Sequence, residues 1–372
     1  MIVGVPKEIK PNEYRVAITP SGVRQFVKHG HRVLIEKDAG VGSNISNEDY
    51  QKEGAEIVSK QTLYSEVELL YKVKEILPEE YPYMRKGLIV FTYLHSNAHR
   101  DETDVLLKQN VMGISYEDIE DEEGTFPLLK PMSEIAGRGG FLAACQFSQS
   151  EYGNGLLLAR LPGVRTPKIA IIGAGSAGMG AAELAAAFGN QVTLLDISIK
   201  KLEHAKEALP PNTEFLYSNE TNIEHCLRES DVLINCILWP KNRKDHLVSR
   251  AMLREMKKDA LIVDVACDEN GAIETCRSTT HDDPVYREEG ILHYCVDNIP
   301  AAYAQTATCL LSNATLPYAL QLADKGVKEA MTENKYFRKG LCFYDGVLTL
   351  KETGLKQNRP YQSPERALGL NV

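Results

Sequence analysis

The chain has 372 residues, 43% of them hydrophobic and 25% charged, which is enough to bury the cores of two ordinary domains. Its net charge of -9 provides no basic face, so nucleic acid is excluded as an expected partner. The N-terminal segment is not of the signal type and no apolar run reaches about eighteen residues, so we expect neither secretion nor a membrane span. The eight cysteines form no Cys-x-x-Cys pair and are expected to be buried thiols of a cytoplasmic protein.

The first third of the sequence alternates short apolar runs with helical patterns. Apolar runs predict five strands, at residues 1–5, 31–36, 67–73, 88–94 and 111–117. Between the first two runs, Thr19 and Pro20 open a helical pattern, because Pro is well tolerated in the first turn of a helix. This alternation predicts βαβ units and therefore a parallel sheet.

A second series of apolar runs begins after residue 167. It predicts six strands, at residues 168–175, 191–198, 214–219, 231–238, 260–266 and 291–296, with helical patterns between them. A helical pattern that starts at Ser133 connects the two series, and another at residues 309–326 is expected to return to the first domain. The sequence thus predicts an α/β protein with two Rossmann-like domains, parallel sheets and a cleft between them. We assign residues 1–128 and 307–372 to one domain and residues 129–306 to the other.

The strongest single motif is a glycine-rich segment directly after an apolar run. Gly173, Gly175 and Gly178 form G-x-G-x-x-G at the start of an Ala-rich helical pattern, a spacing typical of a dinucleotide-binding turn. Asp196 follows eighteen residues after Gly178, where a carboxylate can accept from both ribose hydroxyls and would repel the phosphate of NADP. The motif favours NAD, although two lysines soon after Asp196 weaken the charge argument. The alternative is a tight glycine turn without a ligand.

Three polar residues follow predicted strands at the end where open α/β sheets bind their ligands. They are Arg15, Lys74 and His95. Lys72 lies two residues before Lys74 on the same strand face, so we expect one of the two lysines to face the cleft. A guanidinium and an ammonium in this place are suited to a carboxylate. The alternative for each basic residue is a solvated surface charge.

His95 has three interpretations. It can be a core histidine with a satisfied hydrogen bond, a metal ligand together with His99, or a catalytic acid/base, since histidine titrates near neutral pH. The metal interpretation lacks a third ligand at a recognisable spacing, so we expect no metal site. Catalysis is favoured because of the strand-end position.

The chain resembles alanine dehydrogenase over nearly its whole length. The resemblance rests on segments in one order: "GVPKEIKPNEYRVAITPSGV", "KVKEILPEEY", "LIVFTYLH", "PLLKPMSEIAGR", "VDVACDENGAIET", "TTHDDPVY" and "SNATLPYALQLADKG". It implies that the split domain binds the substrate and that the central domain binds NAD. It also implies a homo-oligomer, such as a hexamer or dimer, acting on L-alanine, pyruvate and ammonia or related compounds.

The same resemblance implies roles for single residues. Arg15 and Lys74 would bind the substrate carboxylate, and His95 and Asp268 would be catalytic. The residues expected to bind the cofactor are Ser133, Gly173, Gly175, Ser176, Ala177, Gly178, Asp196, Leu238, Asp268 and Asn298. A carboxylate at Asp268 can stabilise a cationic amine and help to activate water, whereas the alternative is a simple turn cap.

Some segments depart from the family pattern. Residues 236–248 contain the only tryptophan, Trp239, and a charge run formed by Lys241, Arg243, Lys244 and Asp245. Other unusual residues are Lys130, Asp297, Ile299 and Tyr303. The charge run is either a solvated surface or a contact for a substrate larger than pyruvate.

Four functions therefore compete. The first is alanine dehydrogenase, and the second is the same chemistry on a larger amino acid or on an opine or saccharopine-type secondary amine. The third is the NAD-binding subunit of a transhydrogenase, which has no use for Arg15, Lys74 and His95 together. The fourth is a non-catalytic NAD-binding module, which would be expected to lack one of these polar residues.

Overall fold

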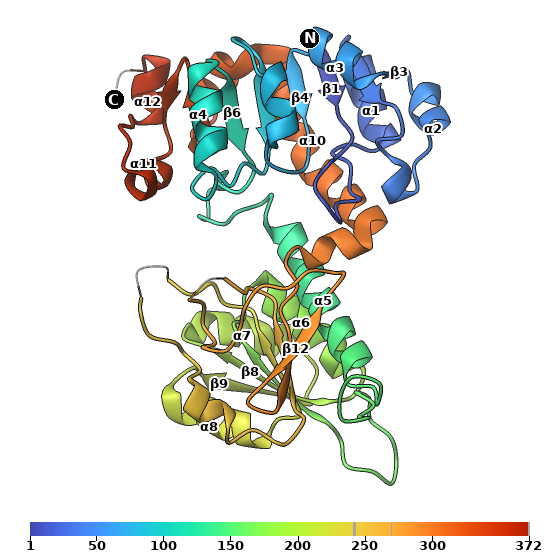
Figure 1. The fold of residues 1–372 in the computed structure, drawn as a ribbon, viewed down its shortest axis with the longest axis vertical. Helices are drawn as coiled ribbons and strands as arrows, with labels where there is room; N and C mark the ends of the chain where they lie inside the picture. Colours follow the sequence, from blue (N-terminus) through green and yellow to red (C-terminus); the bar gives the residue numbers. More distant parts are fainter. Residues whose placement is uncertain (241–242, 269, 371–372) are drawn as a thin grey trace. The chain divides into compact units, whose positions relative to one another are not determined.

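The computed structural model describes residues 1–240, 243–268 and 270–370. The chain forms two compact units, residues 1–132 with 304–372 and residues 133–303, which are described separately (Figure 1). The α/β class predicted from the sequence is confirmed, because each unit holds a largely parallel sheet with helices. No helix in the described part of the chain is both long and apolar enough to span a membrane.

Unit 1, residues 1–132 with 304–372, contains an eight-stranded sheet. Its order is β15-β14-β6-β5-β4-β1-β2-β3, and β1 to β6 are parallel. The strands are β1 (Ile2–Val5), β2 (Arg32–Glu36), β3 (Glu56–Val58), β4 (Leu69–Tyr71), β5 (Ile89–Thr92), β6 (Met112–Ser115), β14 (Leu341–Tyr344) and β15 (Val347–Leu348). The five predicted strands are confirmed, whereas β3, β14 and β15 were missed.

The wholly parallel sheet predicted for this unit is wrong at one edge. There β14 pairs antiparallel with β6 and with β15, and a tight turn at Asp345 and Gly346, both with positive φ, reverses the chain between β14 and β15. The helices of the unit are α1 (Pro20–Lys28), α2 (Asn47–Lys52), α3 (Lys60–Glu66), α4 (Arg100–Lys108), α10 (Ala304–Glu333), α11 (Lys351–Gln357) and α12 (Pro364–Leu368).

The long helix α10 ties the C-terminal part of the chain to the N-terminal part. The main-chain N–H groups of Val16 and Thr19 donate to the hydroxyls of Thr308 and Ser312 on α10, each at 3.1 Å. Thr19 precedes α1, but its side chain makes no cap bond to that helix and contacts Ser312 instead. The segment that follows Arg15 is therefore held by residues that lie 292 and 293 positions later in the sequence.

Unit 2, residues 133–303, contains a seven-stranded sheet of order β12-β13-β11-β10-β7-β8-β9. The strands are β7 (Lys168–Ile172), β8 (Gln191–Asp196), β9 (Thr213–Tyr217), β10 (Val232–Asn235), β11 (Leu261–Asp264), β12 (Val285–Glu288) and β13 (Ile291–Tyr294). The six predicted strands are confirmed and parallel. The missed strand, β12, is antiparallel, because Glu289 and Gly290 adopt positive φ and turn it back onto β13.

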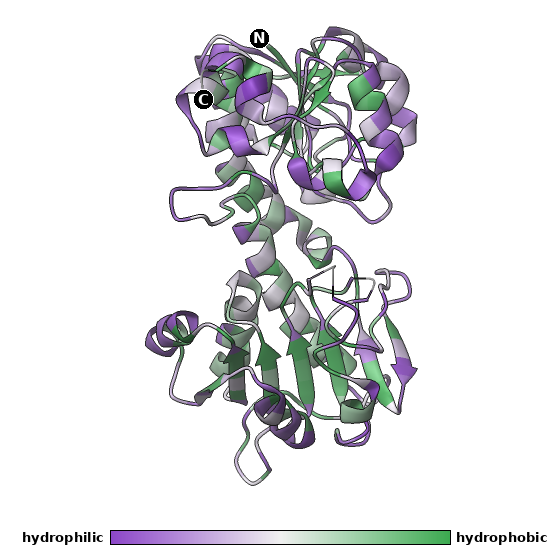
Figure 2. Ribbon diagram, turned by 90° about the vertical axis from the view of Figure 1, so that its left-hand side faces the viewer, coloured by the Kyte–Doolittle hydropathy of each residue, from purple (hydrophilic) through white to green (hydrophobic). Residues whose placement is uncertain are grey.

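Helices pack on this sheet, and three of them follow directly after its strands. They are α5 (Lys130–Phe147), α6 (Ser176–Ala187), α7 (Ile199–Ala208), α8 (Glu220–Glu229) and α9 (Arg250–Leu253). The central strands of both units are hydrophobic while the helices carry polar outer surfaces (Figure 2). All residues of β5, β10 and β11 are buried, as expected for parallel strands covered on both faces.

Candidate active site

The glycine-rich turn of unit 2 joins β7 to α6. Gly173 has a φ of 103°, which an L side chain rarely adopts. A Cβ at Gly178 would lie 1.6 Å from the carbonyl oxygen of Gly173, so this glycine allows α6 to pack closely on the turn. A Cβ at Gly175 would meet no atom within 4 Å, and Ser176 and Ala177 begin the helix there. The open space at the N-terminus of α6 fits the pyrophosphate of a dinucleotide.

Asp196 ends β8 beside this turn. One carboxylate oxygen accepts from the N–H of Ala174 and the other from the N–H of Ser198, both at 2.8 Å. The side chain thus holds the glycine turn against β8. Each oxygen keeps a second lone pair, so the same carboxylate can also accept from ribose hydroxyls.

The other predicted cofactor residues also belong to unit 2. Ser133 lies on α5, and Leu238 is 82% exposed after β10. Asp268 follows β11, and its carbonyl accepts from the N–H of Gly271, as in a turn. Asn298 adopts a φ of 63° in the loop between β13 and the 3-10 turn Ile299–Tyr303.

Arg15 lies in unit 1 and is 2% exposed, so it is not a solvated surface charge. Its Nε and Nη2 donate to the two carboxylate oxygens of Glu13 at 2.7 and 2.6 Å, and its Nη1 lies 3.3 Å from the sulfur of Met132. The bidentate pair orients the guanidinium and balances its charge. Sequence reasoning missed Glu13, for which the only signal is an acid two residues before the arginine.

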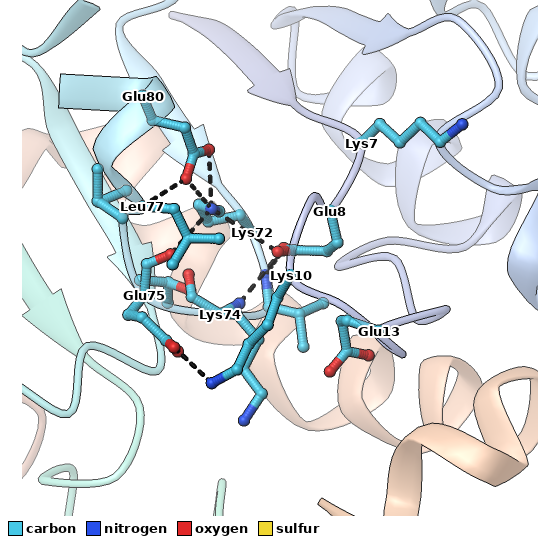
Figure 3. A network of polar contacts seen from close by, with 12 residues as sticks. Lys7, Glu8, Lys10, Glu13, Lys72, Lys74, Glu75, Leu77 and Glu80 are labelled. Carbon is cyan, nitrogen blue, oxygen red and sulfur yellow. Dashed lines mark hydrogen bonds and ion pairs between the residues drawn. The ribbon is translucent and has the colours of Figure 1, made fainter. Parts of the chain in front are cut away.

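Lys72 does not share a strand face with Lys74, so this prediction is wrong. β4 ends at Tyr71, and Lys72 points into the core, where its Nζ lies 2.8 Å from both carboxylate oxygens of Glu80 and 3.7 Å from Glu8 (Figure 3). Lys72 is 1% exposed and is a structural residue. Of the two lysines, Lys74 is therefore the candidate for a ligand.

Lys74 is 9% exposed, and no carboxylate of the described residues lies within ion-pair distance of its Nζ. Its pKa is lowered to about 8 by burial and by the positive charges of Arg15 and Lys10. The neighbouring Glu75 pairs with Lys10 at 2.5 Å instead (Figure 3). A buried ammonium among other cations is a suitable place for an anionic ligand.

His95 follows β5 with a φ of 47°, an unusual conformation for histidine. The carboxylate of Glu117 accepts the N–H of His95 at 2.5 Å, and Nδ1 of the ring lies 3.6 Å from the same oxygen. The ring stacks on Tyr93, with 6.0 Å between centroids. Its side chain is 40% exposed, which disfavours the core interpretation.

The charge state of His95 depends on its neighbours. Enclosure by protein and the positive charge of Lys74 lower its pKa to about 4, so the ring is neutral near pH 7 and can accept a proton. Burial raises the pKa of Glu117. Glu117 was also missed, since nothing in the sequence pairs it with a residue 22 positions earlier.

His99 does not join His95 in a cluster of metal ligands. Its Nε2 lies 3.9 Å from Glu75. Among the described residues, the one cluster of three ligand-type side chains consists of His29, His31 and Asp324 on the surface of unit 1, where both imidazoles contact the Asp324 carboxylate at 2.9 and 2.7 Å. The sequence did not indicate this cluster, because Asp324 is distant in the chain.

The loop with the tryptophan closes on itself. Trp239 donates to the carbonyl of Asp245 at 2.7 Å, and the guanidinium of Arg243 lies over its ring at 4.3 Å. Arg243 also pairs with the carboxylate of Asp245, so these charges satisfy each other. Lys244 is exposed, and Lys241 lies outside the described residues.

Two of the other unusual residues have a packing role. Ile299 and the ring of Tyr303 would lie 2.7 and 2.6 Å from a Cβ at Gly139, so both pack against α5 where a glycine makes room. Asp297 accepts from the hydroxyl of Ser278 at 3.1 Å, and Lys130 is the first residue of α5.

Comparison with known proteins identifies similar chains. Residues 4–136 match the family described as alanine dehydrogenase/PNT, N-terminal domain, and residues 141–351 match its C-terminal domain. Alanine dehydrogenase from Staphylococcus saprophyticus is 44% identical over 370 residues, which cover 99% of this chain and 100% of the relative. Alanine dehydrogenase from Methanococcus maripaludis is 43% identical over 371 residues, with coverages of 99% and 100%.

Solved structures give the same result for the fold. An L-alanine dehydrogenase structure has a TM-score of 0.92 at 39% identity, covering 96% of this chain and 99% of its own. A transhydrogenase from Sinorhizobium meliloti has a TM-score of 0.82 at 21% identity, covering 94% and 100%, and shares the fold.

Proposed function

Because the chain belongs to the alanine dehydrogenase/PNT family, we propose that it catalyses the NAD-dependent oxidative deamination of L-alanine to pyruvate and ammonia, and the reverse reductive amination. One observation in unit 1 carries the proposal. The buried ammonium of Lys74 lies close enough to Arg15 and His95 for their charges to interact, which supports a carboxylate site beside a proton acceptor.

The substrate carboxylate would be bound by Arg15 and Lys74. Glu13 pairs with one edge of the guanidinium and orients it, and Lys74 adds the positive charge that Glu13 balances at Arg15. Binding the carboxylate would also offset the effect of Lys74 on His95 and raise the pKa of the imidazole toward its ordinary value.

His95 would act as the acid/base. In deamination the Cα–H bond of alanine breaks with its electron pair, a C=N bond forms, and water then adds to that carbon. A neutral imidazole can take the proton of the attacking water and return it to the departing amine. Asp268 would stabilise the positive charge on nitrogen as a carboxylate.

The cofactor would be NAD, which when bound supplies the acceptor for the hydride. The turn of Gly173, Gly175 and Gly178 would receive the pyrophosphate at the N-terminus of α6, and Asp196 would accept from the adenosine ribose. Asn298 would lie near the nicotinamide, and Ser133 and Leu238 remain candidates for other contacts with the cofactor.

The decisive experiment measures NADH oxidation with pyruvate plus ammonia, and NAD reduction with L-alanine. We expect turnover in both directions, and much slower turnover with NADPH. The same assay with larger 2-oxo acids and with amines tests the second candidate, an enzyme for a larger amino acid or an opine-type substrate. The mutual pairing of Arg243 and Asp245 gives no support to a contact with such a substrate.

A transhydrogenase role would appear as hydride exchange between NADH and an oxidised nucleotide without an amino acid. The family name includes this class, but nucleotide exchange does not require a buried carboxylate site. We further propose a homo-oligomer of hexameric or dimeric size in the cytoplasm, which size-exclusion chromatography with light scattering can test. Its eight cysteines, all in the described part of the chain, are free thiols, which suits a reducing compartment. The expectation that they are all buried is wrong, because only Cys226, Cys295 and Cys342 are buried and Cys309 is exposed.

A further inference from the structure

The segment Lys72–Leu77, which carries Lys74, is joined to the neighbouring strand only at its start. The N–H of Lys72 donates to the carbonyl of Phe91 at 3.2 Å, and the carbonyl of Val73 accepts from the N–H of Tyr93 at 3.3 Å. Beyond it, the main chain takes its hydrogen bonds mainly from buried side chains of distant segments.

Three acidic side chains accept the main-chain N–H groups of this segment. Glu8 accepts from Val73 at 2.6 Å and from Lys74 at 3.3 Å. Glu102, on α4, accepts from Ile76 at 2.6 Å, and Glu80 accepts from Leu77 at 2.9 Å. Figure 3 shows Glu8 and Glu80 reaching the segment from different sides.

The main-chain carbonyls are held in the same way. The hydroxyl of Tyr116 donates to the carbonyl of Lys72 at 2.8 Å, and the hydroxyl of Thr92 donates to the carbonyl of Lys74 at 2.7 Å. The Lys72 ammonium donates to the carbonyl of Glu75 at 3.1 Å and to Glu80. Lys74 is therefore held at both its N–H and its carbonyl.

Burial of these carboxyls lowers the stability of the folded protein. Glu8 and Glu102 are 8% and 1% exposed, and one oxygen of each has no hydrogen-bond partner among the described residues. Burial raises the pKa of both carboxyls. Apolar side chains would avoid the cost of burying a carboxyl, but they would leave the main-chain N–H groups of Val73, Lys74 and Ile76 without these acceptors. The buried acids are explained if the position of the main chain at Lys74 matters for function.

We propose that Glu8, Glu102 and Thr92 are positioning residues, which hold the main chain of Lys74 so that its ammonium group meets the substrate carboxylate. The proposal rests on the proposed function and extends it to residues that do not touch the substrate. Since Lys74 would bind the carboxylate before and during the reaction, its displacement should raise KM for pyruvate more than it lowers kcat.

The test uses the full-length protein and the variant Thr92→Val, which keeps the side-chain shape and removes the donor to Lys74. We expect KM for pyruvate to rise about three- to tenfold, with kcat changed less than about twofold. The control is Thr349→Val. Thr349 is also buried and donates to a carbonyl, that of Leu341 at 2.5 Å, between β14 and β15. It should lower the melting temperature similarly and leave KM unchanged.

A second pair of variants tests the acids. Glu8→Gln keeps an acceptor oxygen for Val73 and Lys74 and should retain a nearly normal KM, whereas Glu8→Ala should raise KM further than Thr92→Val. If Glu8→Ala does not fold, Thr92→Val decides alone. A wild-type KM in Thr92→Val, or the same KM change in Thr349→Val, overturns the positioning proposal. Absence of turnover in the wild-type protein would instead overturn the proposed function.

Discussion

The glycine turn of unit 2 allows a sharp test, because alanine substitutions at two of its glycines should have different effects on folding and on NADH binding. At Gly175 the backbone has φ -80° and ψ -173°, which alanine adopts without strain, and a Cβ would meet no atom within 4 Å. Gly175→Ala should therefore fold normally, and the restricted unfolded chain should even add about 0.4–1 kcal/mol of stability. The new methyl group would occupy the space through which the pyrophosphate approaches the main chain.

Loss of one hydrogen bond to a charged phosphate is worth about 1.5–3 kcal/mol, so NADH should bind roughly ten- to a hundredfold more weakly to Gly175→Ala. Gly178→Ala is the contrasting variant. Its Cβ would lie 1.6 Å from the Gly173 carbonyl oxygen and would force α6 away from the turn. Overpacking of this kind costs about 1–3 kcal/mol, or roughly 2–10 °C in melting temperature.

The assays are NADH fluorescence titration and thermal unfolding of both variants. Binding should be weakened in Gly175→Ala without a fall in melting temperature. If Gly175→Ala binds NADH with the affinity of the wild-type protein, the dinucleotide does not lie on this turn and the argument from the open space is refuted.

Three further predictions concern single side chains. Asp196→Ala should lower kcat/KM for NAD and raise it for NADP in steady-state kinetics, with some loss of stability because the carboxylate also accepts from the N–H groups of Ala174 and Ser198. An unchanged NAD/NADP preference would show that Asp196 does not contact the ribose. His95→Asn should lower turnover about 10²- to 10⁴-fold with little change in melting temperature, because asparagine tolerates the φ of 47°, and a destabilised but active variant would contradict the catalytic role. Lys74, whose pKa is about 8, is charged below that pH, so pyruvate should bind the NADH complex with constant affinity below pH 8 and about tenfold more weakly for each pH unit above it. The variant Lys74→Arg should flatten this dependence, and an equally steep loss in that variant would assign the titration to another group.

Much of the fold could be predicted because parallel strands buried on both faces are continuous apolar runs. This applies to β5 and β10, and all eleven predicted strands are present. The missed strands are the exceptions to this pattern. β3 is only partly buried and β12 and β14 are antiparallel, so that their assignment depends on turns such as Glu289–Gly290 and on pairing with a distant strand.

The candidate site also has one part that local residue spacing predicted and one part that it did not. Local spacing determined the glycine turn, since G-x-G-x-x-G sets the roles of Gly173, Gly175 and Gly178 within one strand and one helix. The identity of the two lysines did not follow from spacing, because Lys72 and Lys74 look alike in the sequence. Only the fold, which ends β4 at Tyr71 and brings Glu80 under Lys72, separates a structural lysine from a candidate ligand.

Residue patterns along the chain were enough to predict the α/β class, the strand ends that precede Arg15, Lys74 and His95, and the family. Which acids accompany these three residues became clear only from the folded chain. Glu13 orients Arg15, Glu117 holds His95, and Glu8 holds Lys74 from segments up to 66 residues away. Burial makes these partnerships strong, and burial is a property of the folded chain that residue spacing does not encode.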